Sequence, residues 1–157
     1  MKIKGILMAA AAVQLVVVMA GCSQEEAKTV HPNEEAVRAA YSAFQRKDLP
    51  AVMERFSDDV TFIVPGRSVQ SGTFAGKPEV GRYFSIVGKF SGGTHTVEPN
   101  EILADDNTVI AQVRATGTHE GDVFDMTVLH VMKVRDRLVT ELRIIPTDQY
   151  AFDAFWT

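Results

Sequence analysis

Residues 123–145, VFDMTVLHVMKVRDRLVTELRII, decide the fold of this chain. They hold two long runs rich in β-branched and aromatic residues, 123–134 and 138–145, with turn-forming Asp136 between them. A short turn between two long strands predicts an antiparallel pair. Two earlier runs of the same kind, at residues 94–103 and 108–118, extend this pair into an antiparallel meander.

The part of the chain before Gly92 is different, because it shows helical rather than strand-like patterns. We predict three helices there: one capped by Asn33, a shorter one capped by Asp48, and one that begins near Lys77 and ends at Gly88. A single strand, residues 60–64, is expected between the second and third helices. Helices in the first half and strands in the second predict an α+β domain, with helices covering one face of a single sheet.

The back of this sheet is expected to be covered as well. Both runs of the 123–145 stretch carry apolar residues at odd- and at even-numbered positions, which point to opposite faces of a strand. Neither face of the sheet can therefore be wholly exposed. We predict a homodimer through the back of the sheet. The alternative is that the C-terminal segment, with Phe152, Phe155 and Trp156, folds over that face. These aromatic residues could also close a cavity instead, and the sequence does not decide between the two.

The N-terminus predicts the location of the protein. Lys2 and Lys4 precede an apolar run at residues 6–18, and then Ala20, Gly21 and the single cysteine, Cys22. This resembles a bacterial lipoprotein signal, in which the cysteine is lipidated and becomes the mature N-terminus. We therefore expect a signal peptide at 1–21, a lipid-attached flexible tether at 22–33 and a domain at 34–157. The alternatives are a membrane-spanning anchor and ordinary secretion.

Net charge and residue composition limit the kinds of molecule that this protein is expected to bind. Loss of Lys2 and Lys4 with the signal leaves 14 basic against 20 acidic groups, a net charge of about −6, which disfavours nucleic-acid binding. The four histidines are far apart in the sequence, no two of them are spaced as a pair on one helix, and the chain has only one cysteine. We therefore expect no metal site. No phosphate-binding glycine loop and no Ser-His-Asp pattern stands out, and no cofactor is predicted. The expected partners are a small molecule and, through the lipid, a membrane of the bacterial cell envelope on its periplasmic or extracellular side.

The order of elements, together with several short segments, resembles the nuclear transport factor 2-like superfamily, in particular its SnoaL-like and ketosteroid-isomerase-like branch. The resemblance covers about residues 34–157. It implies a cystatin-like fold, in which a strongly curved antiparallel sheet forms a cone around about three N-terminal helices and leaves a cavity at its open end. The segments that carry it are residues 40–44, 58–62, 64–66, 71–76 and 130–134.

The resemblance also implies where a reaction would occur. Ketosteroid isomerases remove a proton with a carboxylate base and hold the enolate oxygen with a tyrosine and a protonated acid. Tyr41 corresponds to the tyrosine and His130 to the acid, whereas Val64 stands at the position of the base. Valine cannot accept a proton, so the usual isomerase mechanism is not expected, although the cavity can remain.

Strand periodicity predicts the cavity wall, because side chains two residues apart share one face of a sheet. His130 and Tyr41 are the candidate catalytic residues. His130 could equally be a core histidine satisfied by Tyr41, and Glu141 with Arg143 could be a structural ion pair at the mouth of the cone. The candidate ligand-binding residues are Phe62, Val64, Val113, Ala115, Phe124, Met126, Val128, Glu141, Arg143 and Ile145.

Three functions remain open from the sequence. The first is a lipid-anchored protein whose cone binds a small, largely apolar molecule without converting it. The second is an isomerase- or cyclase-type enzyme for enolisable carbonyl compounds, with His130 as acid or base, Tyr41 as oxyanion donor and Arg143 as substrate anchor. The third is a dimeric protein-interaction module whose cavity is collapsed.

Overall fold

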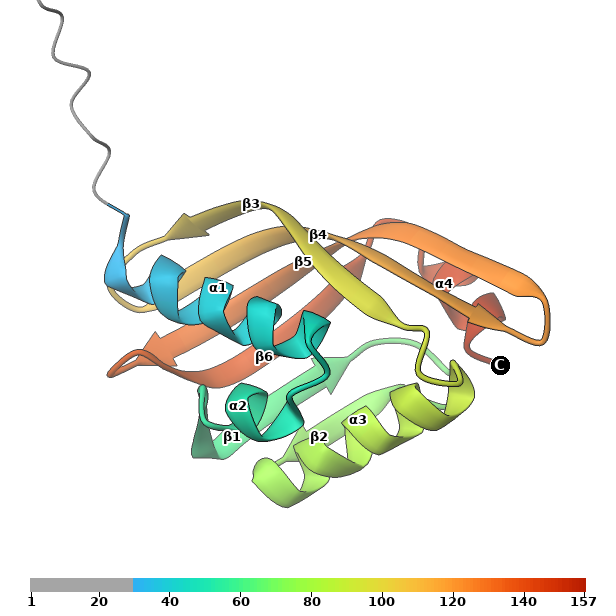
Figure 1. Ribbon diagram of the computed structural model, residues 1–157, viewed down its shortest axis with the longest axis horizontal. Helices are drawn as coiled ribbons and strands as arrows, with labels where there is room; N and C mark the ends of the chain where they lie inside the picture. The colour runs from blue at the N-terminus through green and yellow to red at the C-terminus, as the bar shows by residue number, and fades with distance from the viewer. Residues whose placement is uncertain (1–29) are drawn as a thin grey trace, which may run out of the picture.

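The structure of the protein, a computed structural model, describes residues 30–157 (Figure 1). The predicted signal peptide, Cys22 and most of the predicted tether lie outside these residues. Within them, none of the helices has the length and apolar character needed to cross a membrane.

The predicted α+β class is confirmed. Strands β3 to β6 form the predicted antiparallel meander, and β1 joins it by pairing parallel to β6. The resulting six-stranded sheet has the order β2-β1-β6-β5-β4-β3 and curves around the first three helices without closing (Figure 1). The elements are α1 (Pro32–Gln45), α2 (Leu49–Met53), β1 (Phe56–Val64), β2 (Gly72–Ala75), α3 (Lys77–Phe90), β3 (Thr96–Ala104), β4 (Thr108–His119), β5 (Asp122–Arg135), β6 (Leu138–Pro146) and α4 (Gln149–Phe155).

The predicted cap of the first helix is wrong by two residues. His31 caps α1, and its Nδ1 accepts a hydrogen bond from the backbone N–H of Asn33 at 3.2 Å. Asn33 lies within the helix and is buried, and its Nδ2 donates to the backbone carbonyls of Asp105 and Asp106 at 2.8 and 3.1 Å. Asn33 therefore ties the start of α1 to the turn between β3 and β4.

The other helix boundaries follow local chemistry. The side chain of Asp48 caps α2 as predicted, by accepting a hydrogen bond from the backbone N–H of Ala51 at 3.1 Å. Helix α3 continues past Gly88 to Phe90, contrary to the prediction. Gly92 and Gly93 end it instead, because their φ values of 57° and 78° turn the chain into a conformation that glycine adopts without strain.

The C-terminal segment does not cover the back of the sheet. Phe152 and Trp156, at α4, are buried and pack around Phe124 of β5, with ring centroids 5.9 Å from it in both cases. Phe124 points to the same side of the sheet as α1 and α3. On the opposite, outer face, Leu103, Ile110 and Ile145 keep 59%, 39% and 40% of their surface exposed. The homodimer through this face stays a prediction.

Close contact between α4 and Gly66 leads to a first prediction. Gly66 has a φ of 107°, and a Cβ at this position would overlap the side chains of Asp153 and Gln149. We expect Gly66→Ala to lower the free energy of unfolding by roughly 1–3 kcal/mol, measured by chemical denaturation. The matched control is Gly81→Ala in α3, where a Cβ has no neighbour within 4 Å; it should be neutral or stabilising by up to about 1 kcal/mol. Equal effects of the two substitutions would contradict this packing.

Candidate functional site

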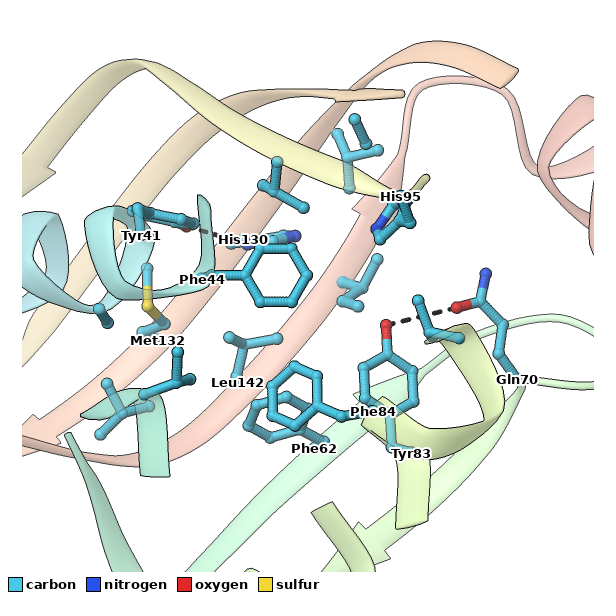
Figure 2. A pocket seen from close by; sticks show the side chains of 18 of the residues that line it. Tyr41, Phe44, Phe62, Gln70, Tyr83, Phe84, His95, His130, Met132 and Leu142 are labelled. Carbon is cyan, nitrogen blue, oxygen red and sulfur yellow. Dashed lines mark hydrogen bonds between the residues drawn. The ribbon is translucent and has the colours of Figure 1, made fainter. Parts of the chain in front are cut away.

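A cavity of about 90 Å³ lies between the helices and the inner face of the curved sheet (Figure 2). This volume is several times the roughly 10–15 Å³ that one water molecule requires, so the cavity can hold more than a single water. Its wall is mostly apolar and aromatic: α1 contributes Phe44, α3 contributes Phe84, and the sheet contributes Phe62, Leu142 and Met132.

One end of the cavity holds a hydrogen-bonded pair. The hydroxyl of Tyr41, on α1, lies 2.9 Å from Nδ1 of His130, on β5, and either group can be the donor. His130 is 8% exposed and lines the cavity. It is therefore both a core histidine with a polar partner and a part of the cavity wall, and its second ring nitrogen, Nε2, makes no hydrogen bond to any residue in the described part of the chain.

Burial sets the protonation of this pair. It lowers the pKa of His130 to about 4 and raises the pKa of Tyr41 well above its ordinary value, because the charged form of each side chain would lose its hydration. Both side chains are therefore neutral at pH 7. His95, which precedes β3 and also lines the cavity, behaves in the same way, since burial lowers its pKa to about 4.

The other end of the cavity contains polar groups that the sequence analysis missed. The hydroxyl of Tyr83, on α3, donates to Oε1 of Gln70 at 3.3 Å, and burial raises the pKa of Tyr83. Gln70 belongs to the loop between β1 and β2, where a polar residue carries no sequence signal for burial. Trp156 completes this end and is 1% exposed. Figure 2 shows Gln70 and Tyr83 on one side of the cavity and Tyr41 with His130 on the other.

Most of the predicted wall residues point to the predicted side of the sheet. Phe62, Ala115, Phe124 and Val128 line the cavity together with Tyr41 and His130. Three others share this face without reaching the cavity: Val64 and Val113 are buried in the core beside it, and Met126 is half-buried.

Glu141, Arg143 and Ile145 were assigned to the wrong face. Lys133 pairs with Glu141 and Val134 with Val139, so Thr140 is an extra residue that reverses the parity of β6. Ile144 therefore lies opposite His130, and Leu142 lies opposite Met132. These two side chains line the cavity, and the alternation of polar and apolar residues at 141–145 is a sequence signal that could have identified them.

Glu141 and Arg143 lie on the outer face, where they form an ion pair at 3.6 Å between Oε1 and Nη2, with both side chains about half exposed. The prediction that Glu141 and Arg143 form a structural ion pair is confirmed. The prediction that this pair lies at the mouth of the cone is wrong.

The side chains that line the cavity are uncharged. Among residues 30–157, its lining contains no aspartate, glutamate, lysine or arginine. Within residues 30–157, no cluster of three or more metal-ligating side chains is present. The site can thus offer neutral hydrogen-bond donors and acceptors in apolar surroundings, and its lining supplies no carboxylate base.

The two buried histidines predict how stability depends on pH. Their folded-state pKa is depressed, so between pH 6.5 and about 4 the unfolded chain binds protons that the folded chain does not. The free energy of unfolding should be highest above pH 6.5 and should fall by roughly 2–4 kcal/mol per histidine as the pH drops through this window.

Denaturation at a series of pH values measures this slope. His130→Leu should flatten it, because the variant removes one titrating group. Tyr41→Phe is the matched control: it removes the hydrogen bond but keeps the buried imidazole, so it should lower stability and retain the slope. An unchanged slope in His130→Leu would refute the contribution of His130.

Similar proteins are known. The family model of the SnoaL-like domain matches residues 37–142. An uncharacterized protein of Mycobacterium tuberculosis, Rv0034, is 30% identical over 123 residues, which cover 78% of this chain and 94% of that protein.

Solved structures show the same fold. Bal32a, from a soil-derived mobile gene cassette, superimposes with a TM-score of 0.77 at 30% identity, over 80% of this chain and 97% of that chain. TerC, co-crystallized with polyporic acid, superimposes with a TM-score of 0.72 at 24% identity, over 80% of this chain and 98% of that chain. The fold is shared with NTF2-like proteins. The chain therefore belongs to the SnoaL-like domain family.

Proposed function

We propose that the protein binds a small, largely apolar molecule in the cavity between its helices and its sheet, and does not convert it. The observation that carries this proposal is the cavity itself, which is walled by apolar side chains, with a few neutral polar groups at its two ends. Such a lining is typical of small-molecule sites, in which apolar walls supply affinity and a few polar groups fix orientation. The crystallization of TerC with polyporic acid supports a small-molecule role for this fold.

The same groups favour binding over catalysis. Among the described residues the lining holds no carboxylate, and burial lowers the pKa of His130 to about 4, so at pH 7 this imidazole is neutral and cannot act as a protonated acid. Arg143 lies on the outer face and cannot anchor a substrate in the cavity. The enzyme hypothesis thus loses its substrate anchor and the protonated form of His130. An interaction module with a collapsed cavity does not match a cavity of about 90 Å³.

Filling the cavity should abolish binding. Val128→Phe places a larger side chain in the wall, and Val131→Phe makes the same change on the outer face of the same strand. We expect small uncharged compounds such as methylenecyclopentane to raise the melting temperature of the wild type and of Val131→Phe, and to have at least a tenfold weaker effect on Val128→Phe. Trp156 is the single tryptophan and lines the cavity, so its fluorescence gives a second measurement.

Ala115→Leu fills the same wall from β4 and replaces Val128→Phe if that variant does not fold. Failure of the wild type to respond to any compound in a panel of small uncharged molecules, by both melting temperature and fluorescence, would contradict the binding proposal.

We also propose that the domain is lipid-anchored in the bacterial cell envelope through Cys22. The support is the sequence of residues 1–22 alone. Cells that produce the wild-type chain and are fed labelled palmitate should yield a labelled protein whose mature N-terminus is Cys22. Cys22→Ser should lose the label, because serine lacks the acyl-accepting thiol, whereas Ser23→Ala should keep it. A label that persists in Cys22→Ser would exclude this anchor.

A further inference from the structure

Two buried N–H groups in the cavity wall have no hydrogen-bond partner within the described residues: Nε2 of Gln70 and Nε1 of Trp156. Their side chains are only 2% and 1% exposed. Buried polar groups in folded proteins are nearly always paired, and an unpaired one destabilises the fold. The other unpartnered buried polar atoms in the described residues are Nδ1 of His95, which also lines the cavity, and Oγ of Ser57, which does not. The unpartnered groups thus gather on the cavity wall.

Gln70 and Trp156 lie at the same end of the cavity. The backbone N–H of Val69 donates to the carbonyl oxygen of Trp156 at 3.0 Å, which holds the loop that carries Gln70 against the C-terminus. His95 packs edge-on against the indole, with ring centroids 5.3 Å apart. We call Gln70 and Trp156 the donor end.

The amide of Gln70 has a fixed role at the donor end. The Tyr83 hydroxyl donates to Oε1 at 3.3 Å, whereas the NH₂ group has no partner among the described residues (Figure 2). Trp156 can only donate, because an indole nitrogen carries a hydrogen and no acceptor. Each group therefore requires an acceptor, and a ligand that carries an oxygen atom would supply one.

We propose that the donor end recognises an uncharged oxygen acceptor, so that the preferred ligand is a small carbonyl compound with an apolar body. This inference rests on the proposed function. A hydrocarbon of the same shape would displace water from the donors without replacing its hydrogen bonds. A carboxylate would enter a cavity whose lining has no lysine or arginine, and would be buried without a countercharge.

Three compounds with equal numbers of non-hydrogen atoms test this preference: cyclopentanone, methylenecyclopentane and butyrate. Titration calorimetry should show cyclopentanone binding roughly 3- to 10-fold more tightly than methylenecyclopentane, the effect of one added hydrogen bond, and butyrate binding more weakly than both. In ¹H–¹⁵N spectra the single tryptophan gives one indole resonance, which should move downfield with cyclopentanone and not with methylenecyclopentane.

Trp156→Phe keeps an aromatic ring and removes the donor, and Gln70→Met removes the amide at similar length. Each should reduce the preference for the ketone over the alkene by at least about twofold. Tyr150→Phe is the matched control, since Tyr150 lies in α4, the helix that ends just before Trp156, and is 91% exposed. It should retain the wild-type ratio. Because the indole resonance is measured on the unmodified chain, the test does not depend on the folding of the variants.

The outcomes separate this inference from the proposed function. Equal affinities of the wild type for the ketone and the alkene would overturn the donor end and leave a purely apolar binding site intact. Tighter binding of butyrate than of cyclopentanone would overturn the preference for an uncharged ligand. Absence of binding by all three compounds would overturn both proposals.

Discussion

The pairing of β5 with β6 is the constraint on which the site depends. His130 lies opposite Ile144 and Met132 opposite Leu142, and this register selects the side chains of both strands that enter the cavity. Because side chains alternate between faces, a shift of one residue would exchange Leu142 and Ile144 for Glu141, Arg143 and Ile145. The extra residue Thr140 prevents this exchange. One bulge therefore decides whether the cavity is apolar or contains an ion pair.

An apolar cavity in turn fixes the protonation of its polar groups. The described lining has no charged side chain, so burial dominates: it lowers the pKa of His130 and His95 and keeps both imidazoles neutral at pH 7. It also raises the pKa of the two tyrosines, which are neutral at this pH in any case. A carboxylate facing His130 would have favoured the imidazolium form and given the site a proton to transfer. Val64, the position that the family resemblance aligns with the isomerase base, is packed in the core. The same apolar packing thus creates the cavity and removes the acid–base chemistry.

The sequence predicted the strands of the meander and the inward direction of Phe124, Val128 and His130, because strong periodicity in long strands depends on local chemistry alone. Prediction from the sequence failed for residues whose position is set by a contact with a residue far away in the chain. Asn33, the predicted cap, lies inside the helix, where its side-chain amide donates to the carbonyls of Asp105 and Asp106. Gln70 was missed because its burial depends on Tyr83, which lies on another element. The parity of β6 depends on a bulge that strand periodicity alone does not show.

The C-terminal helix shapes one end of the cavity from outside the part of the chain that the family match covers. The SnoaL-like match spans residues 37–142, which include most of the cavity wall but end before α4 and Trp156. Helix α4 is held by contacts to the loop after β1: the backbone N–H of Arg67 donates to Oδ1 of Asp153 at 3.1 Å, and Gly66 leaves room for that side chain. The shared sheet thus supplies the hollow, whereas a C-terminal segment outside the family match supplies one of the two groups at the donor end. Changes in α4 could therefore alter ligand preference without disturbing the sheet.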